Sequence, residues 1–226
     1  MRVRMTEAAQ EIPVKLDPRG SADRPSVHRR AFVWASGVAL AMAALRGADA
    51  QTTEPAGMIE EIKGEGFAES RSGRRTLERN SSVFVADLVG TGAASRLLIH
   101  LGEQTRVRLG EQARIIIDRY LIDAGGEFRL EAGAMHFDRP SGKSSPIRIR
   151  SPYGLIAVRG TRFFAGPSAG VFGVFVERGS VSVTAAEREV VLLMGQGTDI
   201  PHPGDKPMTA RRWRDLRIHE AMESVF

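Results

Sequence analysis

The chain of 226 residues contains no cysteine. A disulfide framework, a catalytic thiolate and a metal site with cysteine ligands are therefore excluded. A chain without cysteine is compatible with an oxidising compartment. Apolar residues make up 42% of the sequence and aromatic residues 6%, which is enough apolar material for one sizeable core.

The sequence also lacks a large charge excess outside its N-terminus. The formal net charge is +5, of which +3 falls in residues 1–50 and only +2 in residues 51–226. A dedicated nucleic-acid binder needs a net basic face. We therefore expect no nucleic-acid partner, although the composition leaves room for a local arginine patch.

Signatures of enzymes and metal sites are missing. The histidines are scattered without ligand spacing, at positions 28, 100, 136, 202 and 219. Residues 90–95 imitate part of a dinucleotide fingerprint, but a strand-like segment follows them instead of a helix. Asp138 could be paired with Glu131 or Glu177, yet no motif supports such a pair of carboxylates. We expect no catalytic residue, no metal and no cofactor, and an envelope hydrolase is the weakest hypothesis.

Residues 1–50 have the three parts of an export signal. A basic segment over 1–30 ends in Arg29 and Arg30, an apolar segment covers 31–45, and small residues at 48–50 form a cleavage site. As a helix the apolar segment would span about 22 Å, short of a hydrocarbon core of about 30 Å. A short permanent membrane span is the alternative.

The arginine pair resembles the twin-arginine export signal. Arg29 and Arg30 are followed by Ala31, Phe32 and Val33, as in that signal, whereas His28 departs from the usual Ser or Thr. The resemblance implies export of a folded protein. Ala48 and Ala50 are the small residues of the expected cleavage site. We expect cleavage directly after Ala50, which gives a mature chain that begins at Gln51. The true start of the chain is either Met1 or Met5.

Residues 57–202 are dominated by short segments of alternating apolar and polar residues, which predict strands. Residues 51–56 form a linker before them. The expected strands are 58–63, 82–85, 96–100, 105–109, 113–118, 127–131, 134–138, 146–150, 155–158, 162–165, 171–177, 180–184 and 190–193. This spacing predicts an all-β fold, either a β-sandwich or a roll with solenoid-like rungs.

An internal repeat favours the roll. Residues 101–108 read LGEQTRVR and residues 109–116 read LGEQARII. Each copy combines a turn-prone Gly-Glu-Gln with an extended segment, so we expect two successive rungs of similar conformation. Two copies are fewer than the three or so that a solenoid array needs.

Residues 203–226 predict a linker followed by a short C-terminal helix. Thr209 is a suitable N-cap for a helix that ends near Met222. We expect Trp213, Leu216 and either Ala221 or Met222 to face inward. The arginines of this segment are expected to face outward, at positions 211, 212, 214 and 217.

The segment 151–161 resembles the signature of the FecR domain family. Pro152 leads into an aliphatic strand that ends in Val158-Arg159-Gly160-Thr161. A Glu-x-Gly-x-Val turn at Gly179 and a Gly-Gln element at Gly195 and Gln196 follow in the family's order. Gly102-Glu103-Gln104 departs from the family's usual Asp-Gly-Ser turn. The resemblance covers about residues 57–202.

This resemblance implies a non-catalytic, β-rich module in the periplasm or at the cell surface of a Gram-negative bacterium. Some members sense an occupied transporter and control a sigma factor. The expected partner is an envelope protein, peptidoglycan or a polysaccharide, with membrane contact only if the signal is uncleaved. The alternative is a regulator anchored by residues 31–45 that contacts a cytoplasmic partner.

Arg159 and Arg162 stand out within an otherwise apolar stretch. A guanidinium in such a setting must be paired or satisfied by carbonyls, and Gly160 would allow a bulge that gives Arg159 room to reach them. We expect the family-motif residues to be structural. The alternative is an anion or ligand site formed by Arg159 and Arg162.

Overall fold

The structure is a computed structural model that describes residues 55–226, apart from 122–124, 141 and 143–144. Several residues of the expected export signal lie outside the described residues, namely Arg29, Arg30, Phe32, Ala48, Ala50 and the apolar segment 31–45. No helix among the described residues is long and apolar enough to cross a membrane.

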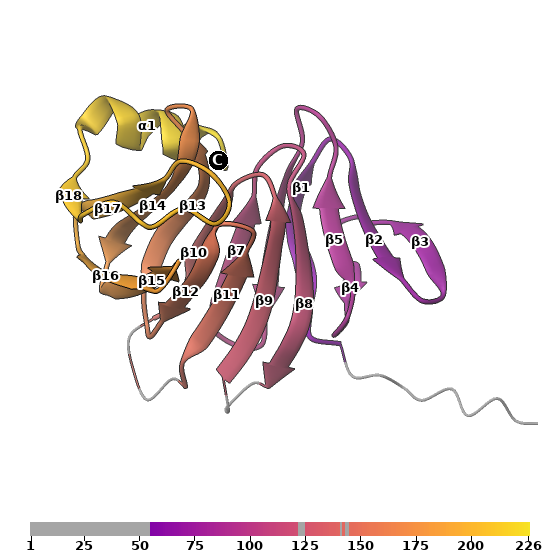
Figure 1. Cartoon of the computed structure of the whole chain (residues 1–226). Helices are drawn as coiled ribbons and strands as arrows, with labels where there is room; N and C mark the ends of the chain where they lie inside the picture. Colours follow the sequence, from indigo (N-terminus) through magenta and orange to yellow (C-terminus); the bar gives the residue numbers. More distant parts are fainter. Residues whose placement is uncertain (1–54, 122–124, 141, 143–144) are drawn as a thin grey trace, which may run out of the picture. The chain divides into compact units, whose positions relative to one another are not determined.

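Two nine-stranded sheets form the fold (Figure 1). Sheet A consists, in spatial order, of β18 (Arg211–Arg212), β17 (Gln196–Ile200), β14 (Val171–Arg178), β13 (Arg162–Ser168), β10 (Met135–Asp138), β7 (Thr105–Leu109), β6 (Arg96–Leu101), β1 (Gly57–Lys63) and β4 (Ser82–Val83). Sheet B consists of β16 (Arg188–Leu193), β15 (Ser180–Ala185), β12 (Gly154–Val158), β11 (Ile147–Ser151), β9 (Gly125–Ala132), β8 (Arg114–Leu121), β5 (Leu88–Thr91), β2 (Gly66–Ser70) and β3 (Gly73–Thr76). The one helix of the described part is α1 (Asp215–Glu223).

The two sheets enclose one apolar core, so the all-β sandwich is confirmed. Alternation along each strand turns one set of side chains into this core and the other outward. In β7, Val107 and Leu109 are fully buried, whereas Arg106 and Arg108 point out from the same strand. Phe128 from sheet B and Phe137 from sheet A meet edge to face, with ring centroids 6.4 Å apart.

The chain crosses repeatedly between the sheets and advances steadily from one end of the sandwich to the other. Neighbouring strands are antiparallel throughout, except for the parallel pair β9 and β11. These two run parallel because β10 lies in sheet A between them and returns the chain to its starting end.

All thirteen expected strands are present, most with shifted ends, but β2, β3, β5, β17 and β18 were missed. In β5 and β17 a glycine interrupts the apolar alternation because an aromatic ring occupies the place of its side chain. A Cβ on Gly90 in β5 would lie 2.4 Å from the ring of Phe67, and one on Gly197 in β17 would lie 2.3 Å from the indole of Trp213.

The expectation of two similar rungs from the repeat is wrong. The first copy forms a hairpin within sheet A, because Gly102 adopts a positive φ of 56° between β6 and β7. The second copy instead carries the chain from β7 in sheet A to β8 in sheet B. The same Gly-Glu-Gln therefore makes a tight turn once and a crossing between sheets once.

The C-terminal helix is shorter than predicted, and a different set of its side chains faces the sandwich. Arg211 and Arg212 form β18 and pair with β17, so α1 begins only at Asp215. Trp213 and Ala221 are buried, as expected. Leu216 is 69% exposed instead of facing inward. Arg217 was expected to face outward, but its side chain is only 15% exposed because it pairs with buried Asp199.

Candidate functional site

A groove crosses the outer face of sheet A beside the C-terminus of the chain. Its volume is about 300 Å³. The acids lining it are Glu60, Asp138 and Glu177, and the basic groups are Arg106, Arg108, Arg162 and His136. Leu98 and the terminal Phe226 add apolar surface. We call this feature the sheet A groove.

Ion pairs across the strands organise one end of the groove. Arg106 Nε lies 3.0 Å from Glu60 Oε2, and Arg108 Nη1 lies 3.0 Å from Glu61 Oε2. Both pairs connect β7 with β1 over the intervening strand β6, where buried Leu98 lies opposite Arg108. The Arg108 guanidinium also lies over the ring of Phe226, 4.7 Å from its centroid.

Asp138 is the centre of the other end. Its Oδ2 accepts a hydrogen bond from Arg162 Nη2 at 2.6 Å, and its Oδ1 accepts one from Arg178 Nη2 at 2.8 Å. The three side chains come from the adjacent strands β10, β13 and β14. Arg178 also donates to the Arg139 carbonyl at 3.1 Å, so it joins the groove to the connection after β10.

The charges of this cluster shift its protonation equilibria. Burial raises the pKa of Asp138, but hydrogen bonds and the positive charges of Arg162 and Arg178 outweigh it, so the net pKa is lowered. The hydrogen bond to Asp138 raises the pKa of Arg162. Asp138 is therefore an ionised acceptor at neutral pH and unsuited to act as a general acid.

His136 and Glu177 form the middle of the groove. His136 Nε2 lies 2.9 Å from Glu177 Oε1, and the His136 side chain is only 6% exposed. Phe226 covers the imidazole edge to face, with centroids 5.1 Å apart. The bulge between β13 and β14 turns Glu177 toward the groove. Asp138 and Glu177 thus share the groove, whereas Glu131 lies in sheet B.

Arg159 and Arg162 are not brought together into one site. β12 ends at Val158, so Arg159 lies in the connection to sheet A, where it is exposed. It makes no side-chain hydrogen bond or ion pair with any residue that the structure describes. The expectation that carbonyls surround Arg159 is therefore wrong, because the side chain is exposed at the surface. Arg162 lines the sheet A groove and Arg159 does not.

The remaining motif residues meet at the crossings between the sheets. Gly160 and Gly179 both adopt positive φ, 63° and 86°. A Cβ on Gly179 would lie 2.7 Å from the Thr161 side chain and 3.0 Å from the Gly160 carbonyl. Thr161 is fully buried, so two crossings pack against each other here. Pro152 lies exposed in the turn between β11 and β12.

The late Gly-Gln element closes the turn between β16 and β17. Gly195 adopts φ of 79°, and the Gln196 side chain accepts a hydrogen bond from the Leu193 amide at 2.9 Å. The next residue, Gly197, lets the indole of Trp213 lie directly on the sheet. Trp213 stacks on Phe175 with centroids 5.2 Å apart, which anchors the C-terminal segment.

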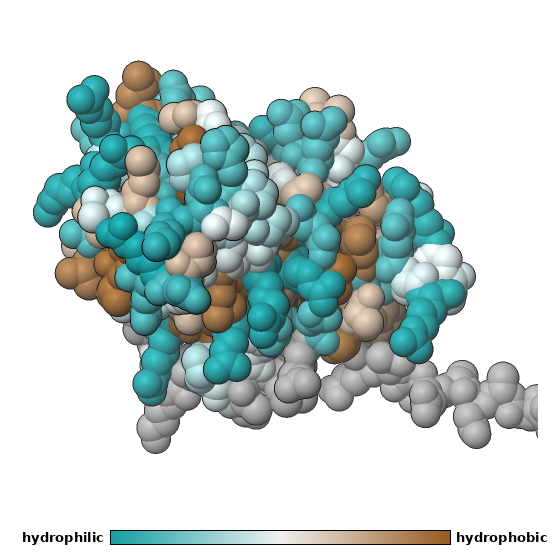
Figure 2. All heavy atoms as spheres, viewed as in Figure 1, coloured by the Kyte–Doolittle hydropathy of each residue, from teal (hydrophilic) through white to brown (hydrophobic). Residues whose placement is uncertain are grey.

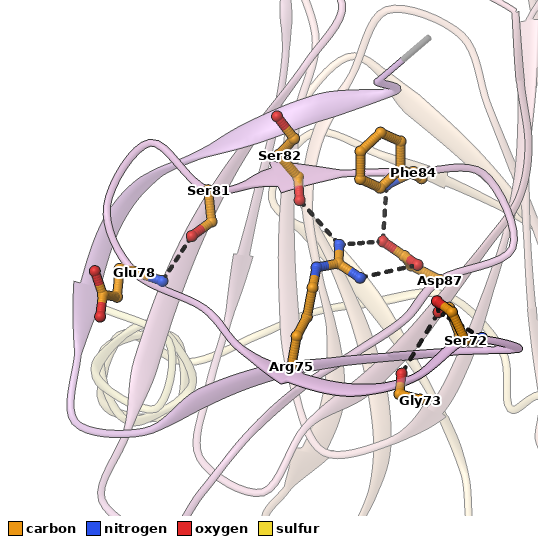
Figure 3. Close-up of polar contacts among 9 residues, drawn as sticks. Ser72, Gly73, Arg75, Glu78, Ser81, Ser82, Phe84 and Asp87 are labelled. Carbon is orange, nitrogen blue, oxygen red and sulfur yellow. Dashed lines mark hydrogen bonds and ion pairs between the residues drawn. The ribbon is translucent and has the colours of Figure 1, made fainter. Parts of the chain in front are cut away.

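Two buried aspartates were missed by the sequence reasoning. Asp199, 3% exposed, accepts hydrogen bonds from Arg217 and Arg211 and ties α1 and β18 to β17. Asp87, 2% exposed, accepts a 2.6 Å hydrogen bond from Arg75 and one of 2.8 Å from the Phe84 amide (Figure 3). Neither residue belongs to a motif, so only the fold identifies its partners.

The groove itself could have been found in part. Arg106 and Arg108 alternate on one expected strand, and His136 and Asp138 alternate on another. Two-residue spacing places each pair on one face. Which strands are neighbours cannot be deduced from spacing, and β10 lies beside β7 only because the chain crosses to sheet B between them.

The central part of this sandwich matches one protein-family model. Residues 87–182 match the family model described as FecR protein. The FecR match begins at the buried Asp87 and includes the groove residues on β7, β10, β13 and β14. It ends within β15, so Glu60 on β1 and Phe226 lie beyond it.

One solved structure supports a shared fold. Two crystal structures of a candidate anti-sigma factor from Parabacteroides distasonis, at 1.65 Å and 2.50 Å resolution, match with 15% and 14% identity. Their TM-scores are 0.49 and 0.51, and each match covers 58% of this chain. This chain spans 62% of the length of those proteins. At such identity the second match supports a common fold only.

No curated protein matches the chain. Among the residues that the structure describes, no group of three or more His, Asp or Glu side chains is arranged to hold a metal ion.

Proposed function

We propose that the protein is a FecR-type, non-catalytic module that is exported to the cell envelope and binds a partner there as part of signal sensing. The observation that carries this proposal is the FecR match over residues 87–182. These residues supply the central strands of the sandwich and most of the sheet A groove.

The N-terminal sequence supports export. Arg29, Arg30 and Phe32 are spaced as in a twin-arginine signal, and Ala48 and Ala50 supply the small residues of a cleavage site. The periplasm is the destination that such a signal implies for a Gram-negative bacterium. A cysteine-free sandwich needs no disulfide formation there.

The electrostatics of the sheet A groove support binding instead of catalysis. Each of its acids is held by a basic partner: Glu60 by Arg106, Asp138 by Arg162, and Glu177 by His136. Catalytic acids are usually groups whose pKa is raised toward neutrality, whereas the pKa of Asp138 is lowered. A surface with both charge signs suits a polar partner that carries both, such as a protein segment or a peptidoglycan stem peptide.

The test is the location of the full chain in cells. We expect the wild-type protein in the periplasmic fraction, and we expect Arg29→Lys together with Arg30→Lys to retain it in the cytoplasm. Arg2→Lys together with Arg4→Lys is the matched control and should be exported normally. Equal retention of both double variants, or export of both, would contradict the twin-arginine route.

A second candidate is a membrane-anchored regulator. The apolar segment 31–45 favours it, because an uncleaved signal would tether the sandwich to the membrane and leave residues 1–28 beside a cytoplasmic partner. A membrane fraction that contains uncleaved protein would favour this candidate over the soluble one.

A further inference from the structure

A second cavity of about 410 Å³ lies at the end of the sandwich that carries the C-terminal segment. It is lined by Arg211, Arg212, Arg214 and Arg217 around Trp213. We call it the arginine pocket. Its residues come from β18, from the N-terminal turn of α1 and from the two residues between them.

Two of the four arginines are held by the protein. Arg217 Nη2 lies 2.7 Å from Asp199 Oδ1, and its guanidinium stacks 3.7 Å above the centre of the Trp213 ring system. Arg211 pairs with the same carboxylate. Asp199 is buried beneath them, so these contacts fix the floor of the pocket.

The other two arginines are free to bind a ligand. Arg212 and Arg214 are exposed, and neither forms an ion pair with a residue in the described part of the chain. The first turn of α1 adds to the positive field, since Arg214 is its N-cap and no side chain caps its amides. Asp215 is the one acid of that turn, so positive charge exceeds negative charge around the pocket.

Exposed apolar side chains border the arginine pocket. Leu193 and Met194 are 56% and 67% exposed, in the turn that leads to Gln196, and Gln196 pairs with Arg212. Leu216, two residues after Arg214, is 69% exposed. Figure 2 shows apolar surface beside hydrophilic surface at this end, where Figure 1 places β16, β18 and α1.

From this combination we infer that the arginine pocket docks the protein on an anionic phospholipid surface. Guanidinium groups bind phosphate through paired hydrogen bonds. A free phosphate ligand would require only the arginines, whereas a lipid surface also takes up the neighbouring Leu193, Met194 and Leu216 side chains. The partner is thus the phosphate-bearing headgroup layer of a membrane, a contact that does not depend on residues 31–45.

The inference is tested by flotation of the full chain with vesicles. One set contains phosphatidylcholine alone and the other phosphatidylcholine mixed with phosphatidylglycerol. Residues 31–45 would bind both sets alike, and the basic residues of segment 1–30 would add the same anionic preference to every variant, so the loss of preference on substitution reports on the arginine pocket. We expect Arg212→Gln with Arg214→Gln to reduce that preference about thirtyfold, equivalent to about 2 kcal/mol, or about 1 kcal/mol per arginine.

The control removes the same charge elsewhere. Arg71→Gln with Arg79→Gln changes two exposed arginines beside β3, at the other end of both sheets, and should retain the anionic preference. Equal losses in the two double variants, or no preference in the wild type, would overturn the inference.

The source of the phosphate is tested with a soluble headgroup analogue. The chain has two tryptophans, Trp34 and Trp213, so in a Trp34→Phe background the emission reports on the pocket alone. Glycerol phosphate should change this emission only weakly and without saturation at millimolar concentrations. Saturable binding of glycerol phosphate without a preference for anionic vesicles would overturn the lipid assignment, because the pocket would then serve a free ligand.

Discussion

At the scale of single residues, Asp138 determines the character of the sheet A groove. It accepts hydrogen bonds from Arg162 and Arg178 on two neighbouring strands. Without this carboxylate the two guanidiniums would face each other across paired positions of β13 and β14. The position that looked unusual in the sequence, an arginine after Gly160 and Thr161, is thus explained by an acid 24 residues earlier.

We predict that Asp138→Asn lowers the free energy of unfolding at neutral pH by about 1–2 kcal/mol, because it weakens two charge-assisted hydrogen bonds at a partly exposed site. The pKa of Asp138 is lowered in the folded state, so its stabilisation is complete above its unfolded pKa of about 4. It is lost as the pH falls through the lower folded value. Denaturant unfolding at neutral and acidic pH measures this difference.

The difference between wild type and Asp138→Asn should therefore shrink in acid. Arg159→Gln is the control, since Arg159 is exposed and unpaired among the described residues, and it should change stability by less than about 0.5 kcal/mol at any pH. A constant difference from neutral to acidic pH would contradict the assigned role of Asp138.

Gly197 shows how one missing side chain positions the C-terminal segment. A Cβ there would lie 2.3 Å from Trp213 Nε1 and 2.6 Å from the Val174 carbonyl. We predict that Gly197→Ala destabilises the protein by about 1–3 kcal/mol through overpacking, with a change in Trp213 fluorescence. In a Trp213→Ala background the same substitution should cost less. An equal cost in both backgrounds would show that the indole is not the obstacle.

At the scale of elements, Arg217 attaches α1 to the sandwich together with the apolar contacts of Ile218, Ala221 and Met222. Arg217 donates to Asp199, to Ser168 Oγ at 3.0 Å and to the Ser168 carbonyl at 3.3 Å, and it stacks on Trp213. A sequence pattern of alternating apolar and basic residues assigns an arginine to the outside by default. The buried acid that reverses this assignment lies on another strand.

We predict that Arg217→Gln lowers the free energy of unfolding by about 2–4 kcal/mol, because it leaves much of the Asp199 charge uncompensated in a buried position. Arg214→Gln removes the same charge from an exposed neighbour and should change stability by less than about 0.5 kcal/mol. Thermal unfolding of the two variants compares them directly. Similar midpoints would mean that Arg217 does not anchor the helix.

Strands were predicted well where apolar and polar residues alternate, as in β7 and β11. They were missed where a glycine interrupts the alternation, as Gly197 does beneath Trp213 in β17. The repeat at Leu101 and Leu109 misled because local sequence does not specify whether a turn stays in one sheet or crosses to the other. That choice depends on which strands are neighbours, which is a property of the complete sandwich.

At the scale of the whole molecule, the sequence sufficed for the all-β class and for the resemblance later matched at residues 87–182. It did not suffice for the sheet A groove, whose side chains come from β1, β7, β10, β13, β14 and the last residue of the chain. Such a surface exists only after the strand order is established. The residues that line the arginine pocket, by contrast, are nearly contiguous, so the sequence shows them as a basic segment. The sequence does not show that buried Asp199 holds two of them.

The central claim is that the sandwich works as an exported envelope module. The most direct measurement is the intact mass of the protein recovered from cells, with and without a functional twin-arginine translocase. The account predicts a soluble form that begins at Gln51 and disappears without the translocase. A membrane-bound form that still carries residues 31–45 would contradict it and would favour the anchored regulator.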